Sequence, residues 1–293
     1  MANMTATTMA TWIPKVYSKV ATVTLRAKTV LRPLMDHSWE SELKEKGGDT
    51  VNIPAFSQNS GAVARATFGT AAGLSTELIA TTEVQVQLVV NKMAIYGSAV
   101  PKEDLLQEMS TYATLRAQGI GESLNLYLDN QLAADNTNGL DGFSTVVGED
   151  NVDLTEDNII TCKVNLNNAN APLDNRYFVI SPAADGPLSK IESFRNAQYR
   201  SSTGAYDANK SQGFIAGPIH TFMFYMSNNL EAGTSGKKGA AWQQQAIAIA
   251  VQQDVKIDRE FSVIDGLLSY EVGSIVFGQK EGKDSFGNEV DTK

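Results

Sequence analysis

Residues 57–74 read SQNSGAVARATFGTAAGL and lie between two strand-like runs, VNIPAF (51–56) and VQVQLVV (84–90). With Phe68 as the one large apolar side chain in its middle, the stretch cannot build a core of its own. It is also too long for an ordinary turn. The alternation of Val and Leu with Gln in the second run is typical of a half-buried strand. The two runs are therefore predicted to be the arms of one long hairpin, with a tip that extends to Thr82.

The composition of the 293-residue chain allows one large domain or two ordinary ones. Apolar residues make up 42%, which is enough for a core, and the net charge is -9. An acidic chain binds phosphate backbones poorly, but it can lie beside nucleic acid without sticking to it. A single cysteine, Cys162, excludes an internal disulfide framework, and two histidines exclude a three-histidine metal site. Without a long apolar run or a secretory signal, a soluble protein of a reducing compartment is expected.

The N-terminal segment is basic, because five basic residues and no acidic one occur before residue 36. They are Lys15, Lys19, Arg26, Lys28 and Arg32. Two interpretations fit this pattern. The residues form a solvated basic face, or they belong to an arm that docks on acidic surfaces of neighbouring subunits.

A very long helix is predicted after the hairpin, over residues 102–134. Glu103 and Asp104 lie in its first turn, where acidic side chains suit the positive end of the helix dipole. Apolar residues then recur at threes and fours, and the helix would span about 45–50 Å. Gly119 and Gly121 interrupt the pattern, which predicts a bend or close backbone packing there.

Residues 143–251 are predicted to form a mixed α/β region. Thr155 is a candidate N-cap for a helix in LTEDNIITCKVNLNNAN (154–170), with Asn158 at the capping-box partner position. RYFVIS (176–181) is typical of a buried strand. The other expectations are a loop leading into a short helix (181–198), two strand-like runs broken by Gly217-Pro218 (213–227), a loop at EAGTSGKKGAAW (231–242), long strands at VKIDREF (255–261) and LLSYEVGSIVFGQK (267–280), and a polar tail (281–293).

No motif for chemistry is found, and no cofactor or metal is predicted. EAGTSGKKGAA departs from the phosphate-binding loop pattern at Glu231 and Lys238, and DNTNGLDG (135–142) lacks the ligand ladder of a calcium loop. Without a G-x-S-x-G elbow, His220 is interpreted as a core or surface residue rather than as a catalytic one. His37 is interpreted as a solvated or capping residue. Cys162 and the FMFYM run (222–226) are predicted to belong to the core.

The order of these features resembles that of the major capsid proteins of tailed double-stranded DNA bacteriophages, which have the Hong Kong 97-type fold. GGDTVNIPAF (47–56) through VQVQLVVNK (84–92) resembles their extended loop, which lies over a neighbouring subunit. VNKMAIYGSAVPKEDLLQ (90–107) resembles the entry to the peripheral domain and its spine helix. QGFIAGPIHTFMFYMSNNL (212–230) is similar to a strand pair of the axial domain, and residues 241–280 resemble the return to the peripheral domain.

The resemblance implies an α+β fold in five parts. They are an N-terminal arm (1–43), a long β-hairpin extended loop with flanking peripheral-domain strands (44–96), a peripheral domain with the spine helix (97–142), an axial domain (143–251), and peripheral-domain return strands with a C-terminal tail (252–293).

The function that the resemblance implies is that of a structural protein and not an enzyme. The chain would assemble with itself into hexamers and pentamers of an icosahedral capsid that encloses double-stranded DNA without sequence-specific binding. It would be made in the host bacterial cytoplasm, would end up in the virion, and would contact no membrane. Expected partners are a separate scaffolding protein, a portal and decoration proteins. Arg65, Phe68 and the five basic N-terminal residues are the candidates for contacts between subunits.

The family's lysine crosslink is not expected at the loop tip, because no lysine occurs between Lys46 and Lys92. Three alternatives stay open. One is an encapsulin-like shell that encloses protein cargo, another is a hydrolase that uses His220, and the last is a secreted adhesion module, against which the lack of a signal argues.

Overall fold

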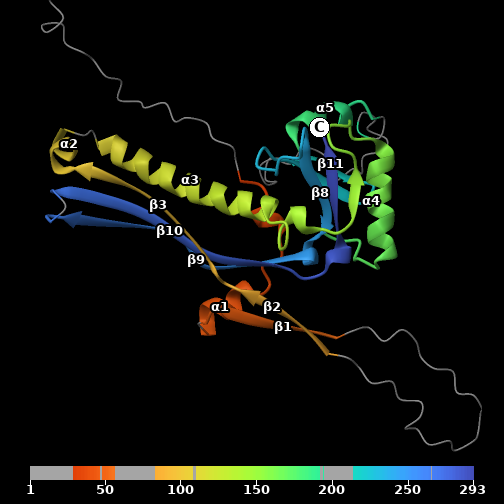
Figure 1. Cartoon of the computed structure of the whole chain (residues 1–293), viewed down its shortest axis with the longest axis horizontal. Helices are drawn as coiled ribbons and strands as arrows, with labels where there is room; N and C mark the ends of the chain where they lie inside the picture. Colours follow the sequence, from red (N-terminus) through yellow and green to blue (C-terminus); the bar gives the residue numbers. More distant parts are fainter. Residues whose placement is uncertain are drawn as a thin grey trace, which may run out of the picture.

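The computed structural model describes residues 29–46, 48–56, 83–107, 110–191, 194, 214–264 and 266–293. An elongated half contains the long helix α3 beside strands β3, β9 and β10, and a more compact half contains α4, β8 and β11 (Figure 1). The described helices are η1 (Arg32–Leu34), α1 (Glu40–Lys46), α2 (Lys102–Gln107), α3 (Ser110–Ala134), η3 (Leu140–Gly142), α4 (Glu156–Asn168), α5 (Pro182–Leu188), η5 (Gln244–Ala246) and η6 (Asp284–Phe286). The described strands are β1 (Thr50–Phe56), β2 (Glu83–Val89), β3 (Lys92–Pro101), β4 (Val146–Gly148), β5 (Arg176–Ile180), β6 (Phe214–Ile219), β7 (Phe222–Met226), β8 (Lys237–Gln243), β9 (Ile247–Ser262), β10 (Leu268–Glu281) and β11 (Gly287–Thr292).

The predicted hairpin is confirmed, because β1 and β2 pair antiparallel from Thr50 opposite Val89 to Phe56 opposite Glu83. Its root has a small core of its own. Val51 and Leu88 are buried there with Leu43 of α1. Residues 57–82, which include the stretch SQNSGAVARATFGTAAGL, lie outside the described residues.

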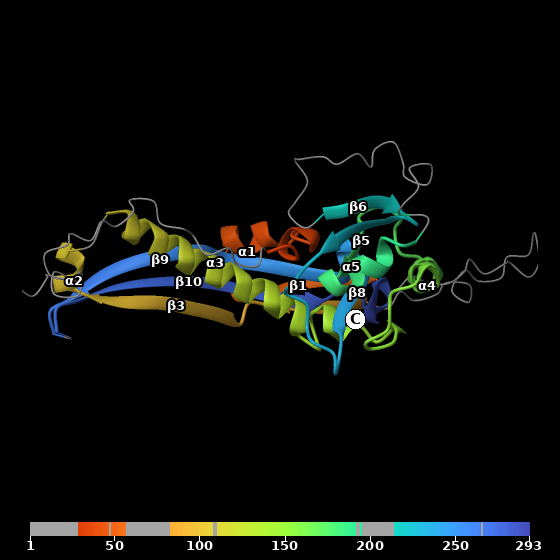
Figure 2. The same ribbon diagram turned by 90° about the horizontal axis from the view of Figure 1, so that it is seen from above.

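The elongated half is a three-stranded antiparallel sheet, in the order β3-β10-β9, with α3 lying along one face (Figure 2). The buried side chains of α3 follow the predicted spacing, with Ile120, Leu124, Leu128 and Leu132 in one stripe. Gly273 on β10 faces this stripe, and a Cβ atom at that position would clash with the side chains of Ile120 and Leu124. The missing side chain therefore allows the helix to lie close to the sheet.

Of the two alternatives predicted for the glycines of the long helix, a bend or close backbone packing, close packing is not found. A Cβ atom on Gly119 would have no neighbour within 4 Å, and one on Gly121 would meet the Val255 side chain at 3.9 Å. The predicted end of the helix at residue 134 agrees with the end of α3 at Ala134.

Because space is open at Gly119, Gly119→Ala is expected to raise the free energy of unfolding by about 0.5–1 kcal/mol. The gain comes from the lower backbone entropy of alanine in the unfolded chain. Urea unfolding followed by circular dichroism measures it, with Gly273→Ala as the opposite control, because its Cβ would clash with α3. Destabilisation by Gly119→Ala would mean that the helix is strained at this point.

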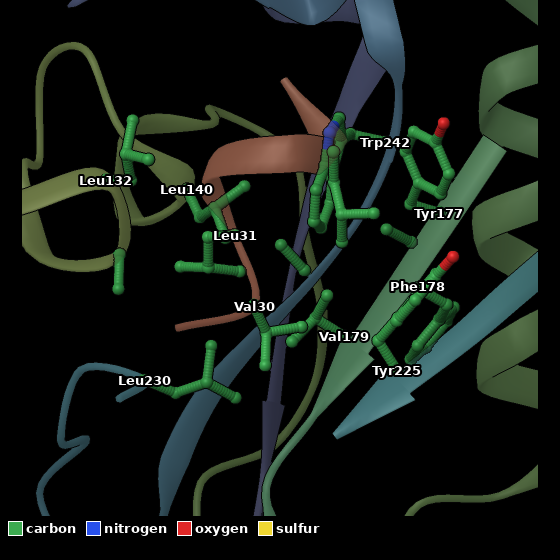
Figure 3. Close-up of a cluster of buried hydrophobic side chains, with 14 of the residues drawn as sticks. Val30, Leu31, Leu132, Leu140, Tyr177, Phe178, Val179, Tyr225, Leu230 and Trp242 are labelled. Carbon is green, nitrogen blue, oxygen red and sulfur yellow. The ribbon is translucent and has the colours of Figure 1, made fainter. Parts of the chain in front are cut away.

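The compact half is a mixed six-stranded sheet in the order β4-β11-β8-β5-β7-β6. As RYFVIS predicted, every residue of β5 is buried. Phe178 on β5 stacks on Phe224 with ring centroids 4.9 Å apart. Phe222, Phe224 and Tyr225 of the FMFYM run are core as predicted, whereas Met223 is partly buried and Met226 is 36% exposed. Figure 3 shows this cluster reaching Val30 and Leu31 at one end of the described chain and Leu132 at the end of α3. One continuous core therefore joins the two halves.

Helix α4 begins as predicted. The Thr155 side-chain oxygen accepts a hydrogen bond from the Asn158 backbone N–H at 3.3 Å, which satisfies one of the donors that an α-helix leaves unpaired at its start. Cys162 is buried on the inner face of α4. Burial raises the pKa of its thiol to about 12, so it is a small core residue and not a nucleophile.

The predicted break at Gly217-Pro218 is wrong, because both residues lie within β6. The turn to β7 is made by His220 and Thr221, with φ angles of 50° and 76°. The short helix α5 also begins at once, at Pro182, since the Ser181 side-chain oxygen accepts a hydrogen bond from the Ala184 N–H at 3.1 Å.

The loop predicted at residues 231–242 and the polar tail predicted at 281–293 are both partly strand. β8 takes up Lys237–Gln243, and β11 pairs with β8 on one side and with β4 on the other. Gly239 allows β8 to lie close to β5, because a Cβ atom at this position would be 2.5 Å from the Val179 carbonyl oxygen. Two polar side chains of β11 find partners inside the fold, since Glu289 pairs with Lys238 at 3.0 Å and the Asn288 Oδ1 accepts a hydrogen bond from Asn165 at 3.0 Å.

Candidate assembly interface

Asp129 fastens the beginning of the described chain to α3. Its carboxylate is fully buried and accepts hydrogen bonds from the backbone N–H groups of Val30 at 3.1 Å, Leu31 at 2.7 Å and Arg32 at 3.3 Å. The Asn229 side-chain amide, between β7 and β8, donates a fourth bond at 2.9 Å. Burial raises the pKa of the Asp129 carboxyl, although these four bonds favour its charged form. The carboxylate therefore holds the root of the N-terminal segment, α3 and the compact half together.

Among the predicted contact residues, Arg32 is the one that the structure describes. Its guanidinium donates to Asp254 on β9 at 2.5 Å, and Lys44 of α1 lies 3.5 Å from the same carboxylate. The hydrogen bond from Arg32 lowers the pKa of Asp254. Arg32 thus pairs within its own chain. Lys15, Lys19, Arg26, Lys28, Arg65 and Phe68 lie outside the described residues.

His37 bridges η1 and α1. Its Nε2 lies 2.8 Å from the Arg32 carbonyl oxygen, and its Nδ1 lies 3.0 Å from Glu40 Oε2 in the first turn of α1. The interpretation of His37 as a residue that caps local structure is consistent with both contacts.

A buried carboxylate links α3 to the outer part of the sheet. Glu271 on β10 lies between two guanidinium groups, with Arg116 Nε of α3 at 3.2 Å and Arg259 Nε of β9 at 3.1 Å. The Glu271 side chain is only 5% exposed, so removing one arginine would leave a buried charge short of partners. The helix α3 and the strands β9 and β10 are therefore tied together at this carboxylate.

Glu281 is a carboxyl group that titrates near neutral pH. It ends β10, next to Asp284 of η6. Burial and the charge of Asp284 raise the pKa of Glu281 from 4.5 to about 7. Between these two pH values the folded chain keeps a proton that the unfolded chain has lost, so stability falls as the pH rises through this window.

Glu281→Gln is expected to stabilise the protein above pH 7 by about 1 kcal/mol, after allowing for solvent screening, and to have no such effect below pH 4.5. The amide still donates a hydrogen bond to Asp284 but cannot ionise. Thermal unfolding at pH 4.5 and at pH 8 measures the difference. Glu149→Gln, which removes an exposed carboxylate, serves as the control. An equal gain at both pH values would contradict the assignment to Glu281.

His220 lies in the turn between β6 and β7. Its Nε2 is 3.0 Å from Oε1 of Glu156, which is in the first turn of α4, and its side chain is 25% exposed. A positive φ and a contact with a neighbouring helix are features of a surface turn residue. Within the described ranges, no group of three or more His, Cys, Asp or Glu could hold a metal ion, and no helix is long and apolar enough to cross a bilayer.

Large apolar side chains are exposed at two places on the elongated half. Met93, Ile95 and Tyr96 on β3 are 59%, 62% and 50% exposed. Around the turn between β9 and β10, Ile264 is 97% exposed, and Phe261, Val263 and Leu267 are also exposed. Exposed apolar surface of this kind marks sites of interaction with other macromolecules. Sequence reasoning missed both places, because a strand exposed on an apolar face has the same pattern as a buried one.

Solved structures of phage capsids match the chain over almost its whole length. A chain in the capsid structure of the cyanophage P-SCSP1u has 15% identity and a TM-score of 0.68, with 100% of this chain and 97% of that chain covered. A chain of the mature capsid of bacteriophage PhiM1 has 11% identity and a TM-score of 0.68, covering 96% and 92%. A chain from Mycobacterium phage Che8 has 17% identity and a TM-score of 0.67, covering 95% and 97%. No family model and no curated protein matches the sequence.

The chain has a mixed α+β fold, the fold of phage capsid structures. The resemblance that the order of sequence features implied is thereby confirmed at the level of the fold.

Proposed function

We propose that the protein is the major capsid subunit of a tailed double-stranded DNA phage, and that it assembles with itself into the hexamers and pentamers of an icosahedral shell. The observation that carries the proposal is the match to capsid chains over nearly the full length of both chains. Large apolar side chains exposed at the strand β3 and at the β9–β10 turn support it, because a shell subunit must cover such surface with copies of itself.

In this proposal the parts of the chain have separate roles. The hairpin β1–β2 is the root of an extended loop that lies over a neighbouring subunit, with Phe68 and Arg65 as contact candidates near its tip. Helix α3 is the spine of the peripheral domain, and the strands β4, β5, β6, β7 and β8 belong to the axial domain over residues 143–251. Lys15, Lys19, Arg26 and Lys28 belong to an arm that contacts acidic surfaces of other subunits.

The proposed partners are a separate scaffolding protein, a portal and decoration proteins. Double-stranded DNA would be enclosed and not bound in a sequence-specific way, which the net charge of -9 favours. The site of action would be the virion, after synthesis in the bacterial cytoplasm. The hydrolase alternative needs His220 as a base, but its ring Nε2 already lies 3.0 Å from the Glu156 carboxylate, in a half-buried turn.

Electron microscopy of the purified full chain, alone and together with a scaffolding protein, tests the proposal. Closed shells or rings of five and six subunits are expected. A protein that stays monomeric at high concentration under both conditions would overturn the proposal. Shells that enclose protein cargo and exclude DNA would replace it with the encapsulin-like alternative.

A further inference from the structure

Strand β3 has an open edge. It pairs with β10 along its whole length, from Lys92 opposite Phe277 to Pro101 opposite Leu268. In the order β3-β10-β9 it is the outermost strand, and no described strand pairs with its other side. The backbone N–H and C=O groups of every second residue along this ten-residue strand therefore face outward, which makes the edge a template for another strand.

The two edges of this sheet differ in charge. Natural edge strands that stay unpaired are protected by charged side chains, by proline or by being short. The outer half of β9 follows that rule, because five of its residues are charged: Asp254, Lys256, Asp258, Arg259 and Glu260. In β3, by contrast, the nine residues MAIYGSAVP (93–101) carry no charge, and its one proline lies at the very end.

The face of β3 that α3 leaves uncovered is apolar. Gly273 faces α3, so its cross-strand partner Tyr96 lies on the same side of the sheet. Since side chains alternate along a strand, Met93 and Ile95 lie on the opposite side, away from α3. Both are more than half exposed, as quoted above. A strand added at this edge would cover them and would also satisfy the outward-facing backbone groups.

We propose that the strand added at this edge is β3 of a second copy of the chain, paired antiparallel about a two-fold axis. A two-fold axis perpendicular to the strand brings it against itself in the antiparallel sense and uses the same residues on both copies. Copies of a chain with net charge -9 repel one another, and like charges placed opposite each other in a sheet add to that cost. The uncharged run 93–101 is a surface on which two copies meet without placing like charges opposite each other.

The inference rests on the proposed shell function and names one contact between the subunits of the shell. The contact can be tested separately from the function. A β3–β3 pair is a property of two copies, so dimers in solution suffice. Shells that form without this contact would overturn the inference and leave the function standing. A protein that forms a crosslinked β3–β3 dimer but never forms shells would support the inference and overturn the proposed function.

The first test compares Ile95→Lys with Ile95→Thr. Both remove the apolar side chain, but threonine keeps a β-branched, uncharged edge, whereas lysine brings like charges together across the axis. Ile95→Lys is expected to weaken self-association, measured by sedimentation, by about tenfold or more relative to Ile95→Thr. Thermal unfolding of the dilute proteins checks that both variants fold. Equal self-association of two folded variants would refute the pairing.

The second test is disulfide crosslinking. Ile95→Cys and Ala99→Cys lie on the same face of β3, and they are tested singly and as a mixture of the two variants. The residue between them is unsuitable, since a Cβ on Gly97 would lie 2.7 Å from the Glu271 carbonyl oxygen. Antiparallel pairing predicts that one combination crosslinks efficiently. If the two-fold axis passes through residue 95 or residue 99, that variant crosslinks with itself. If the axis passes midway between them, the mixture of the two variants crosslinks.

Ser274→Cys is the matched control, because it faces the same side from the central strand β10, opposite Ile95. Two strands would then separate the copies of this residue, which is beyond the reach of a disulfide. Cys162 is buried and stays out of the reaction. Crosslinking at Ser274→Cys as strong as at the edge positions, or no crosslinking at any edge position, would overturn the inference.

Discussion

Asp129→Ala is expected to lower the free energy of unfolding by about 3–5 kcal/mol, enough to unfold a domain of ordinary stability. The carboxylate is fully buried and is the acceptor for three consecutive backbone N–H groups and for Asn229. Alanine leaves all four donors without this acceptor in a place that water does not reach. Denaturant unfolding followed by tryptophan fluorescence and circular dichroism measures the loss.

Two variants make the result specific. Asp129→Asn keeps the shape and one acceptor oxygen, but turns an NH2 group toward N–H donors, so an intermediate loss is expected. Asn130→Ala changes the exposed neighbour on the same helix and is expected to leave stability unchanged within about 0.5 kcal/mol. If Asp129→Ala unfolds at the same denaturant concentration as the unmodified chain, the carboxylate is not the anchor that its contacts indicate.

The elements that the sequence predicts well are those with local causes. The hairpin strands β1 and β2 follow from alternation, the end of α3 at Ala134 from its apolar spacing, and the start of α4 from the Thr155 cap. Each of these signals acts within a few residues of its cause. They are enough to predict the class of fold, because the order of such elements along the chain is itself distinctive.

The elements that the sequence does not predict depend on partners far away in the chain. Strand β11 is polar, yet it lies inside the sheet between β4 and β8, where Lys238 pairs with Glu289 and Asn165 donates to Asn288. Asp129 has its backbone partners 97 to 99 residues away. No local pattern distinguishes this buried carboxylate from a solvated one, so the anchor could be found only in the structure.

The boundary of the N-terminal arm is the clearest case. The family resemblance implies an arm over residues 1–43, and the basic residues before residue 36 fit it. The structure shows Val30, Leu31, Leu34 and Met35 buried in the main core, each at most 3% exposed. The basic pattern does not show where the N-terminal segment joins the core of the protein. That place depends on distant parts of the chain, because Val30 and Leu31 are buried in the main core.

The position of this boundary predicts opposite effects on folding for two truncations that differ by three residues. Deleting residues 1–28 is expected to leave the free energy of unfolding unchanged within about 1 kcal/mol, while abolishing shell formation if the basic segment contacts other subunits as proposed. Deleting residues 1–31 is expected to unfold the protein. It removes the buried side chains of Val30 and Leu31 and also two of the N–H groups that stabilise the Asp129 carboxylate.

Denaturant unfolding and electron microscopy of the two truncated chains separate the role in folding from the role in assembly, because the two chains differ by only three residues. Loss of two core side chains costs about 2–5 kcal/mol each, and a buried carboxylate short of donors adds to that. A folded protein lacking residues 1–31 would show that the anchor at Asp129 is dispensable. Normal shells from the chain lacking residues 1–28 would show that Lys15, Lys19, Arg26 and Lys28 make no contact that assembly requires.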